Sequence, residues 1–406
     1  MDSLITAAAR ALAAGDPLGA LNRIALRDDA PALALRGIAM SQLGDFVRAR
    51  ALLRGAARAF GPRESIARAR CIVAEAEIAL VSRDLGWPAR ALDTAWQVLD
   101  THGDTLNAAH ARYLIARHHL LTGQLDDAER TLAMIDPAPL PPALRAAHEL
   151  IAAGIAVRRV SFSPARDALQ RAGVAARHAG IPALMAEVDG ALDTLRAPVA
   201  RLLARGMEQP LRLDAVEAWF ASDALIVDAC RMVVRQRAAV VPLARRPVLF
   251  ALARALAQAW PDDVPRDVLI ATAFRMRHPD DTHRARLRVE IGRLRKALGK
   301  LAGIHATSQG FALAPLAGVE VAVMTHPVEQ AHAAVLACLA DGESWSSSAL
   351  ALALGTSQRT VQRALDALAE AGKVQPVGGG RARRWMTPAM AGFATALLLP
   401  APLPGA

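Results

Sequence analysis

The sequence predicts a mainly α-helical protein, with a long N-terminal array of helices followed by two small domains that combine helices with a few strands. Three observations support this fold class. The 406 residues are 53% hydrophobic but only 4% aromatic, whereas antiparallel β proteins are rich in aromatic and β-branched residues. Alanine, leucine and arginine, which favour helices, are abundant throughout. Segments of β-forming residues first appear after position 224.

The first predicted domain, residues 1–205, contains a loosely repeated pattern in which a turn residue is followed five positions later by alanine. The pairs are Gly15/Ala20, Gly44/Ala49, Gly86/Ala91 and Gly123/Ala128, with a weaker copy at Ser163/Ala168. Glycine ends one helix, and the small alanine lets neighbouring helices approach closely. Over residues 1–196 the pattern resembles the helical hairpins of tetratricopeptide-type α-solenoids. An irregular all-α bundle is the alternative, and both favour protein contact or ligand sensing over catalysis. A last helix is expected to end near Arg205.

The second predicted domain, residues 206–320, combines strands with three helices. β-forming strings appear first, as LIVDA, RMVVRQ and VVPL. The helices are expected over about 246–259, 265–274 and 282–300, and two strands over 304–307 and 311–313. The order of these elements and the strings RVEIGRLRKAL and SQGFAL resemble the OmpR-type winged-helix domains of response regulators over residues 222–315. That family places its third helix in the major groove of DNA and its hairpin on the backbone, so the resemblance implies the same here.

The third helix of this domain has two contrasting faces. Leu287, Ile291, Leu294 and Leu298 fall on one side at the helical period and predict a buried stripe. The opposite side carries small and basic residues that suit entry into a groove about 12 Å wide. The candidate DNA-contacting residues are Arg284, Arg286, Arg288, Val289, Gly292, Arg293, Arg295 and Lys296, with Ala285 between them. The alternative is a solvated helix with an arginine-rich surface.

The third predicted domain, residues 321–388, repeats the theme without leading strands. Helices are expected over about 327–340, 347–354 and 357–371, and strands over 373–377 and 381–386 around a triple-glycine turn. The run TSQRTVQRALDALAEAGKV resembles the winged helix-turn-helix modules of the MarR, GntR and DeoR families. Recognition helices of this kind contact bases through their first turns. The candidates are Gln358, Arg359, Thr360, Gln362 and Arg363 on the helix, and Arg381, Arg383 and Arg384 on the wing.

Charge separates the two candidate DNA-binding domains. Residues 201–320 hold 19 Lys and Arg against 12 Asp and Glu, a net charge of +7, whereas residues 1–200 carry +2 and residues 321–406 carry +1. A focal excess of positive charge indicates a polyanionic partner. The weak charge of the last domain leaves open that its winged helix contacts protein instead. The apolar, proline-containing tail, residues 389–406, has no assigned role.

Several function classes are disfavoured by the sequence. The three cysteines lie far apart, which argues against a zinc site or a disulfide framework. No paired carboxylates, nucleophile motif or phosphate loop is found, so we predict no enzyme activity, no cofactor and no metal. No stretch is long and apolar enough to suggest a membrane span. We expect a cytoplasmic protein.

Together these features predict a sequence-specific transcriptional regulator of bacterial type that binds double-stranded DNA. The helical array would receive a protein or small-molecule effector. RNA polymerase and a second copy of the chain, as a homodimer on paired half-sites, are further partners consistent with this hypothesis. The competing hypothesis is a protein-interaction scaffold that uses the winged helices as docking modules. The operator sequence and the choice between activation and repression stay open.

Overall fold

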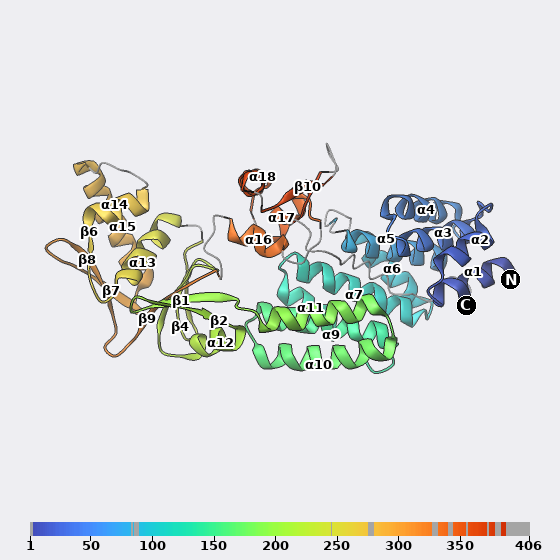
Figure 1. Cartoon of the computed structure of the whole chain (residues 1–406), viewed down its shortest axis with the longest axis horizontal. Coiled ribbons are helices and arrows are strands. Elements are labelled where there is room, and N and C mark those ends of the chain that lie inside the picture. The colour runs from blue at the N-terminus through green and yellow to red at the C-terminus, as the bar shows by residue number, and fades with distance from the viewer. Residues whose placement is uncertain are drawn as a thin grey trace. The chain divides into compact units, whose positions relative to one another are not determined.

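The computed structural model describes residues 3–82, 84, 89–244, 246–274, 280–326, 332–339, 344–354, 356–371, 373–377 and 383–386. The predicted mainly helical character is confirmed, with a smaller share of strands (Figure 1). The chain divides into two compact units. The first contains Met1–Arg159, Pro164–Leu192 and Ala334–Ala406, and the second contains Val160–Ser163 and Asp193–Ala333.

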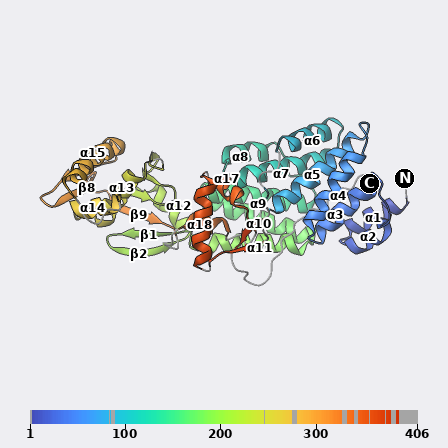
Figure 2. The same ribbon diagram turned by 90° about the horizontal axis from the view of Figure 1, so that it is seen from above.

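The first unit begins with a succession of helices, each packed on the next along most of the row. Figure 2 shows α1 to α9 following one another in chain order. Alternate helices also touch, from α1 and α3 through to α7 and α9. The bounds are α1 Ser3–Ala13, α2 Pro17–Ile24, α3 Ala30–Gln42, α4 Phe46–Ala59, α5 Ser65–Val81, α6 Ala89–Thr101, α7 Thr105–Leu121, α8 Leu125–Ala133, α9 Pro142–Arg158, α10 Phe162–Ala179 and α11 Pro182–Arg196.

The turn-and-alanine pattern has a physical basis in this row of helices. The turn residues Gly15, Gly44 and Gly123 have positive φ angles of 75°, 82° and 79°, a conformation that glycine adopts without steric cost. The paired alanines Ala20, Ala49 and Ala128 are completely buried, so a larger side chain would push neighbouring helices apart. Ala168 is also buried, whereas Gly86 lies outside the described residues.

The second unit contains a six-stranded sheet that the sequence only partly predicts. Its strands lie in the order β2-β1-β9-β3-β4-β5, with β3 and β9 parallel and the other neighbours antiparallel. The bounds are β1 Ala200–Ala204, β2 Met207–Leu211, β3 Leu225–Asp228, β4 Val233–Gln236, β5 Ala239–Pro242 and β9 Val321–Thr325, with helix α12 at Leu213–Ala221.

The expected helix ending near Arg205 is wrong, because the residues just before it form β1 and Arg205 lies in the turn that follows. Arg205 and Gly206 both have positive φ angles, of 50° and 74°, as the two central residues of a type I′ hairpin turn require. The turn pairs β1 with β2, and the other edge of β1 pairs with β9. Strand pairing and burial of Leu202 therefore override the helix-forming composition of the segment.

Three helices and a three-stranded sheet form the rest of this unit. Helices lie at α13 Pro247–Ala259, α14 Arg266–Phe274 and α15 Asp281–Leu298, and strands at β6 Val264–Pro265, β7 Ala302–Ala306 and β8 Gly310–Pro315. The strand order is β6-β8-β7. The helices and the β7–β8 hairpin agree with the predicted elements within a few residues, and β6 is an addition.

The last described elements belong to the first unit. They are α16 Ala333–Leu339, α17 Ser347–Ala353, α18 Gln358–Glu370, β10 Gln375–Val377 and β11 Arg384–Met386. Strands β10 and β11 pair with each other. Buried residues of these elements, such as Leu350, Leu365 and Trp385, share one hydrophobic cluster with residues of α5 to α9. The triple-glycine turn and the tail after residue 388 lie outside the described residues.

Candidate nucleic-acid interface

Helix α15 is positioned by its buried stripe. Leu287, Ile291, Leu294 and Leu298 are each at most 2% exposed and pack in the cluster formed with α13, α14 and the β7–β8 hairpin, as predicted. A capping box begins the helix. The backbone N–H of His283 donates to the Asp280 carboxylate at 2.8 Å, and this bond lowers the pKa of Asp280. The cap satisfies amide groups that the first turn leaves without helical partners.

The outer side of α15 is open to solvent along its length. Val289 is 54% exposed, and a Cβ atom added at Gly292 would meet no atom within 4 Å. The structure therefore brings the sequence-predicted residues of α15 together on one accessible face. All of them are exposed: Arg284, Arg286, Arg288, Val289, Gly292, Arg293, Arg295 and Lys296.

The arginines on this face differ in their intramolecular partners. Arg295 Nε donates to the Ile304 carbonyl at 2.8 Å, which ties α15 to strand β7. Arg286 lies over the Phe274 ring at 4.4 Å, and Arg293 pairs with Glu290 at 2.8 Å.

Arg284 and Arg288, one turn apart on α15, also differ in their partners. Arg284 pairs with Asp281 at 3.4 Å and approaches Asp267 at 3.9 Å. Arg288, like Lys296, forms no hydrogen bond or ion pair with any residue that the structure describes. These two cations are the ones most available to a phosphate.

Substituting alanine for Arg288 is therefore expected to weaken DNA binding through loss of one phosphate contact. The slope of log K against log salt concentration should become shallower by about 0.9. Fluorescence anisotropy titrations at several salt concentrations measure this slope. Arg295→Ala is the matched comparison, because loss of its bond to Ile304 should lower the free energy of unfolding by about 1 kcal/mol. An unchanged slope in folded Arg288→Ala would contradict the placement of α15 on DNA.

Helix α18 presents a second exposed basic group. Ser357 caps the helix by accepting a hydrogen bond from the Thr360 amide at 3.1 Å. Val361, Leu365 and Leu368 are buried, which turns Arg359 and Arg363 outward, where both are exposed. Neither has a hydrogen-bond or ion-pair partner among the described residues.

The polar neighbours of these arginines form hydrogen bonds with residues of α17, of α18 and of the α18 N-cap. Gln358 Nε2 donates to Ser347 Oγ at 3.0 Å, and Gln362 Nε2 donates to Asp366 Oδ1 at 2.9 Å. Thr360 Oγ1 lies 2.8 Å from Ser357 Oγ. Arg359 and Arg363 are thus the free members of the predicted set on α18.

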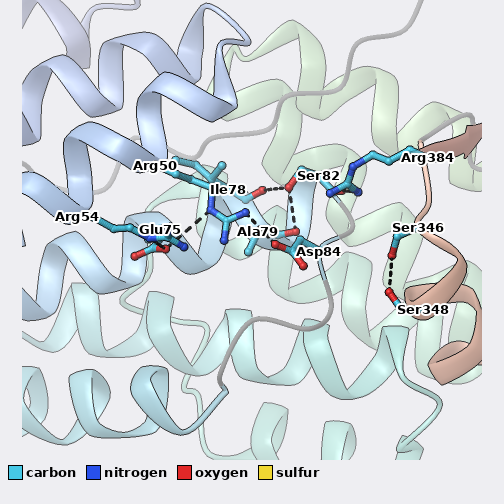
Figure 3. Close-up of polar contacts among 10 residues, drawn as sticks. All are labelled: Arg50, Arg54, Glu75, Ile78, Ala79, Ser82, Asp84, Ser346, Ser348 and Arg384. Carbon is cyan, nitrogen blue, oxygen red and sulfur yellow. Dashed lines mark hydrogen bonds and ion pairs between the residues drawn. The ribbon is translucent and has the colours of Figure 1, made fainter. Parts of the chain in front are cut away.

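The β10–β11 hairpin is engaged by the helical row. Arg384 Nη1 donates to the Ser82 carbonyl at the end of α5, beside Asp84 (Figure 3). Burial lowers the pKa of the Arg384 guanidinium, and Asp84 opposes this effect. Arg383 lies over the Trp385 ring at 4.7 Å, and Arg381 lies outside the described residues. The structure thus separates Arg384 from the exposed arginines of α18.

Two arginines near α15 were not singled out from the sequence. Arg266 donates to the Ser308 and Thr307 carbonyls at 2.8 and 2.9 Å, holding the turn between β7 and β8. Arg246 precedes α13 and is exposed. Neither lies on the amphipathic helix α15, and no sequence motif includes them.

Possible metal ligands, thiols and membrane spans were also sought among the described residues. No group of three or more His, Cys, Asp or Glu residues there could hold a metal ion. Burial raises the pKa of the Cys71 and Cys230 thiols to about 12, so neither is a ready nucleophile. The described helices include none with the length and hydrophobicity to cross a bilayer.

Comparisons with known proteins identify no relative. No family model matches the chain, and neither the curated proteins nor the solved structures contain a match.

Proposed function

We propose that this chain is a sequence-specific DNA-binding transcriptional regulator. The observation that carries the proposal is the exposed face of α15, where small residues lie between basic side chains on an otherwise well-packed helix. Residues 284–300 hold seven basic residues and one acid, Glu290. This arrangement suits a recognition helix, because the small residues permit deep entry and the flanking cations can contact both phosphate walls.

The elements around α15 support a winged-helix interpretation of the second unit. Three helices precede a β7–β8 hairpin, and β6 between the first two helices joins the hairpin as a third strand. Strands β3 to β5 come before α13. This order is the one that the OmpR-type resemblance implies, with α15 as recognition helix and β7–β8 as the wing.

Contacts between alternate helices support a solenoid-like role for the first part of the chain. Each hairpin of such an array packs mainly on its neighbours, as α3, α5, α7 and α9 do here. In this proposal the array receives a protein or small-molecule effector, and helix α18 supplies a second DNA contact through Arg359 and Arg363.

A fragment spanning residues 193–333 should retain DNA binding, because the second unit contains both the sheet and α15. A fragment that begins at Arg205 should lose stability, since it lacks β1, which pairs with β2 and β9. A fragment spanning residues 1–192 carries little net charge and should not bind. Mobility-shift titrations on one selected duplex compare the three. Tight binding by 1–192 alone would contradict the assignment.

A second candidate function is a protein-interaction scaffold, and one observation favours it. Arg384 and Trp385 place the β10–β11 hairpin against α5 to α9, so the wing of the last module already serves a protein contact. Under this alternative α18 would also dock protein. Selection of bound duplexes from a random DNA pool separates the candidates, because a scaffold would enrich no sequence.

A further inference from the structure

A cleft lies between the first turn of α13 and the outer side of α15. Its volume is about 690 Å³, within the range of pockets that hold ligands. Apolar residues of α13, such as Pro247 and Val248, line one side. Three basic residues from the two elements also line it: Arg246, Arg293 and Lys296.

The cleft carries uncompensated positive charge. Glu290, the acidic residue among those that line it, is paired with Arg293 at 2.8 Å. The side chains of Arg246 and Lys296 form no hydrogen bond or ion pair with a described residue, and both are exposed. An anion entering the cleft would therefore meet two cations whose charge is not already neutralised, which favours its binding.

The position of the cleft favours the DNA backbone over an acidic protein segment. A helix with its side chains is about 10–12 Å wide and nearly fills the major groove, so phosphates line both of its sides. On the side of α15 facing the cleft, Arg286 lies over Phe274 and Arg293 is paired with Glu290. Among the described residues that line the cleft, Arg246 and Lys296 are the cations without a hydrogen-bond or ion-pair partner.

We propose that the cleft between α13 and α15 binds phosphates of one DNA strand through Arg246 and Lys296. The DNA interface then extends from the recognition helix to α13, a helix outside the predicted contact set. This inference rests on the proposed DNA-binding function and adds a defined backbone site to it.

The test uses the full chain and a duplex selected from a random pool by the wild-type protein. Single phosphates of that duplex are neutralised by ethylation, and the positions that block binding are mapped for wild type, Arg246→Ala and Lys296→Ala. Each variant should lose interference at the same small group of phosphates. The salt slope should become shallower by about 0.9 for each lost contact.

Arg237→Ala is the matched control. Arg237 is an exposed arginine of the same unit that lies at the turn between β4 and β5, and it is paired with Asp223. Its interference pattern and salt slope should equal those of wild type. If Arg246→Ala and Lys296→Ala bind the duplex with unchanged patterns and slopes, the cleft proposal is overturned while the proposed function stands. If the wild-type protein selects no duplex, the proposed function fails, and the cleft proposal fails with it.

Discussion

Lysine in place of Arg359 or Arg363 is expected to reduce discrimination for guanine by about 1–3 kcal/mol at one base position for each substitution. The two residues lie one turn apart near the start of α18, and both are exposed with no partner among the described residues. Arginine contacts O6 and N7 of guanine together, whereas lysine keeps the charge but lacks the planar fork. Affinities for a selected duplex and its single-base variants measure the effect.

The salt slope supplies an internal control for this substitution. Lysine preserves the positive charge, so the slope should stay close to that of wild type even as base discrimination falls. Glu370→Ala, on the far end of the same helix and also exposed, should leave DNA binding nearly intact. Suppose that both lysine variants discriminate bases as wild type does, while Glu370→Ala abolishes binding to a protein. Helix α18 would then be a docking surface, as the scaffold hypothesis holds.

Helices such as α15 and α18 could be predicted from the sequence because each carries its own apolar stripe. For α15 the period placed Leu287, Ile291 and Leu294 inside, and all three are buried. Strands β1 and β9 could not be predicted, because each is only five residues long and is stabilised by pairing across more than one hundred residues of chain. The composition of β1 alone is compatible with a helix, so tertiary pairing decides the outcome there, whereas the Val and Thr residues of β9 favour a strand.

In the candidate site too, local sequence predicts which residues share a face, whereas contacts with other elements decide which of them have partners. Periodicity identified the basic face of α15 but not which of its arginines are engaged. Arg295 bonds a carbonyl nine residues away, at Ile304, and Arg384 bonds one 302 residues away, at Ser82. Such partners are set by packing between elements. As a result, Arg288 and Arg384 were equivalent candidates from the sequence. In the structure Arg288 has no partner among the described residues, whereas Arg384 donates to the Ser82 carbonyl.

Trp385 connects the hairpin of the last module to the helical row. It is 2% exposed and belongs to the hydrophobic cluster that includes residues of α5 to α9. Its backbone also exchanges two hydrogen bonds of 2.7 Å with Trp345, which precedes α17. A side chain of this size, buried in a cluster that joins segments far apart in sequence, is expected to stabilise both segments.

Alanine in place of Trp385 is therefore expected to lower the free energy of unfolding by about 3–5 kcal/mol, through lost burial and the cavity that remains. Denaturant unfolding followed by circular dichroism measures it, with Val377→Ala as control, since Val377 lies on the paired strand and is 43% exposed. That control should change stability by less than about 1 kcal/mol. Because Trp385 shares a cluster with α5 to α9, hydrogen exchange should also quicken in those helices. A loss confined to α16–α18 and the hairpin would mean that the two segments do not stabilise each other.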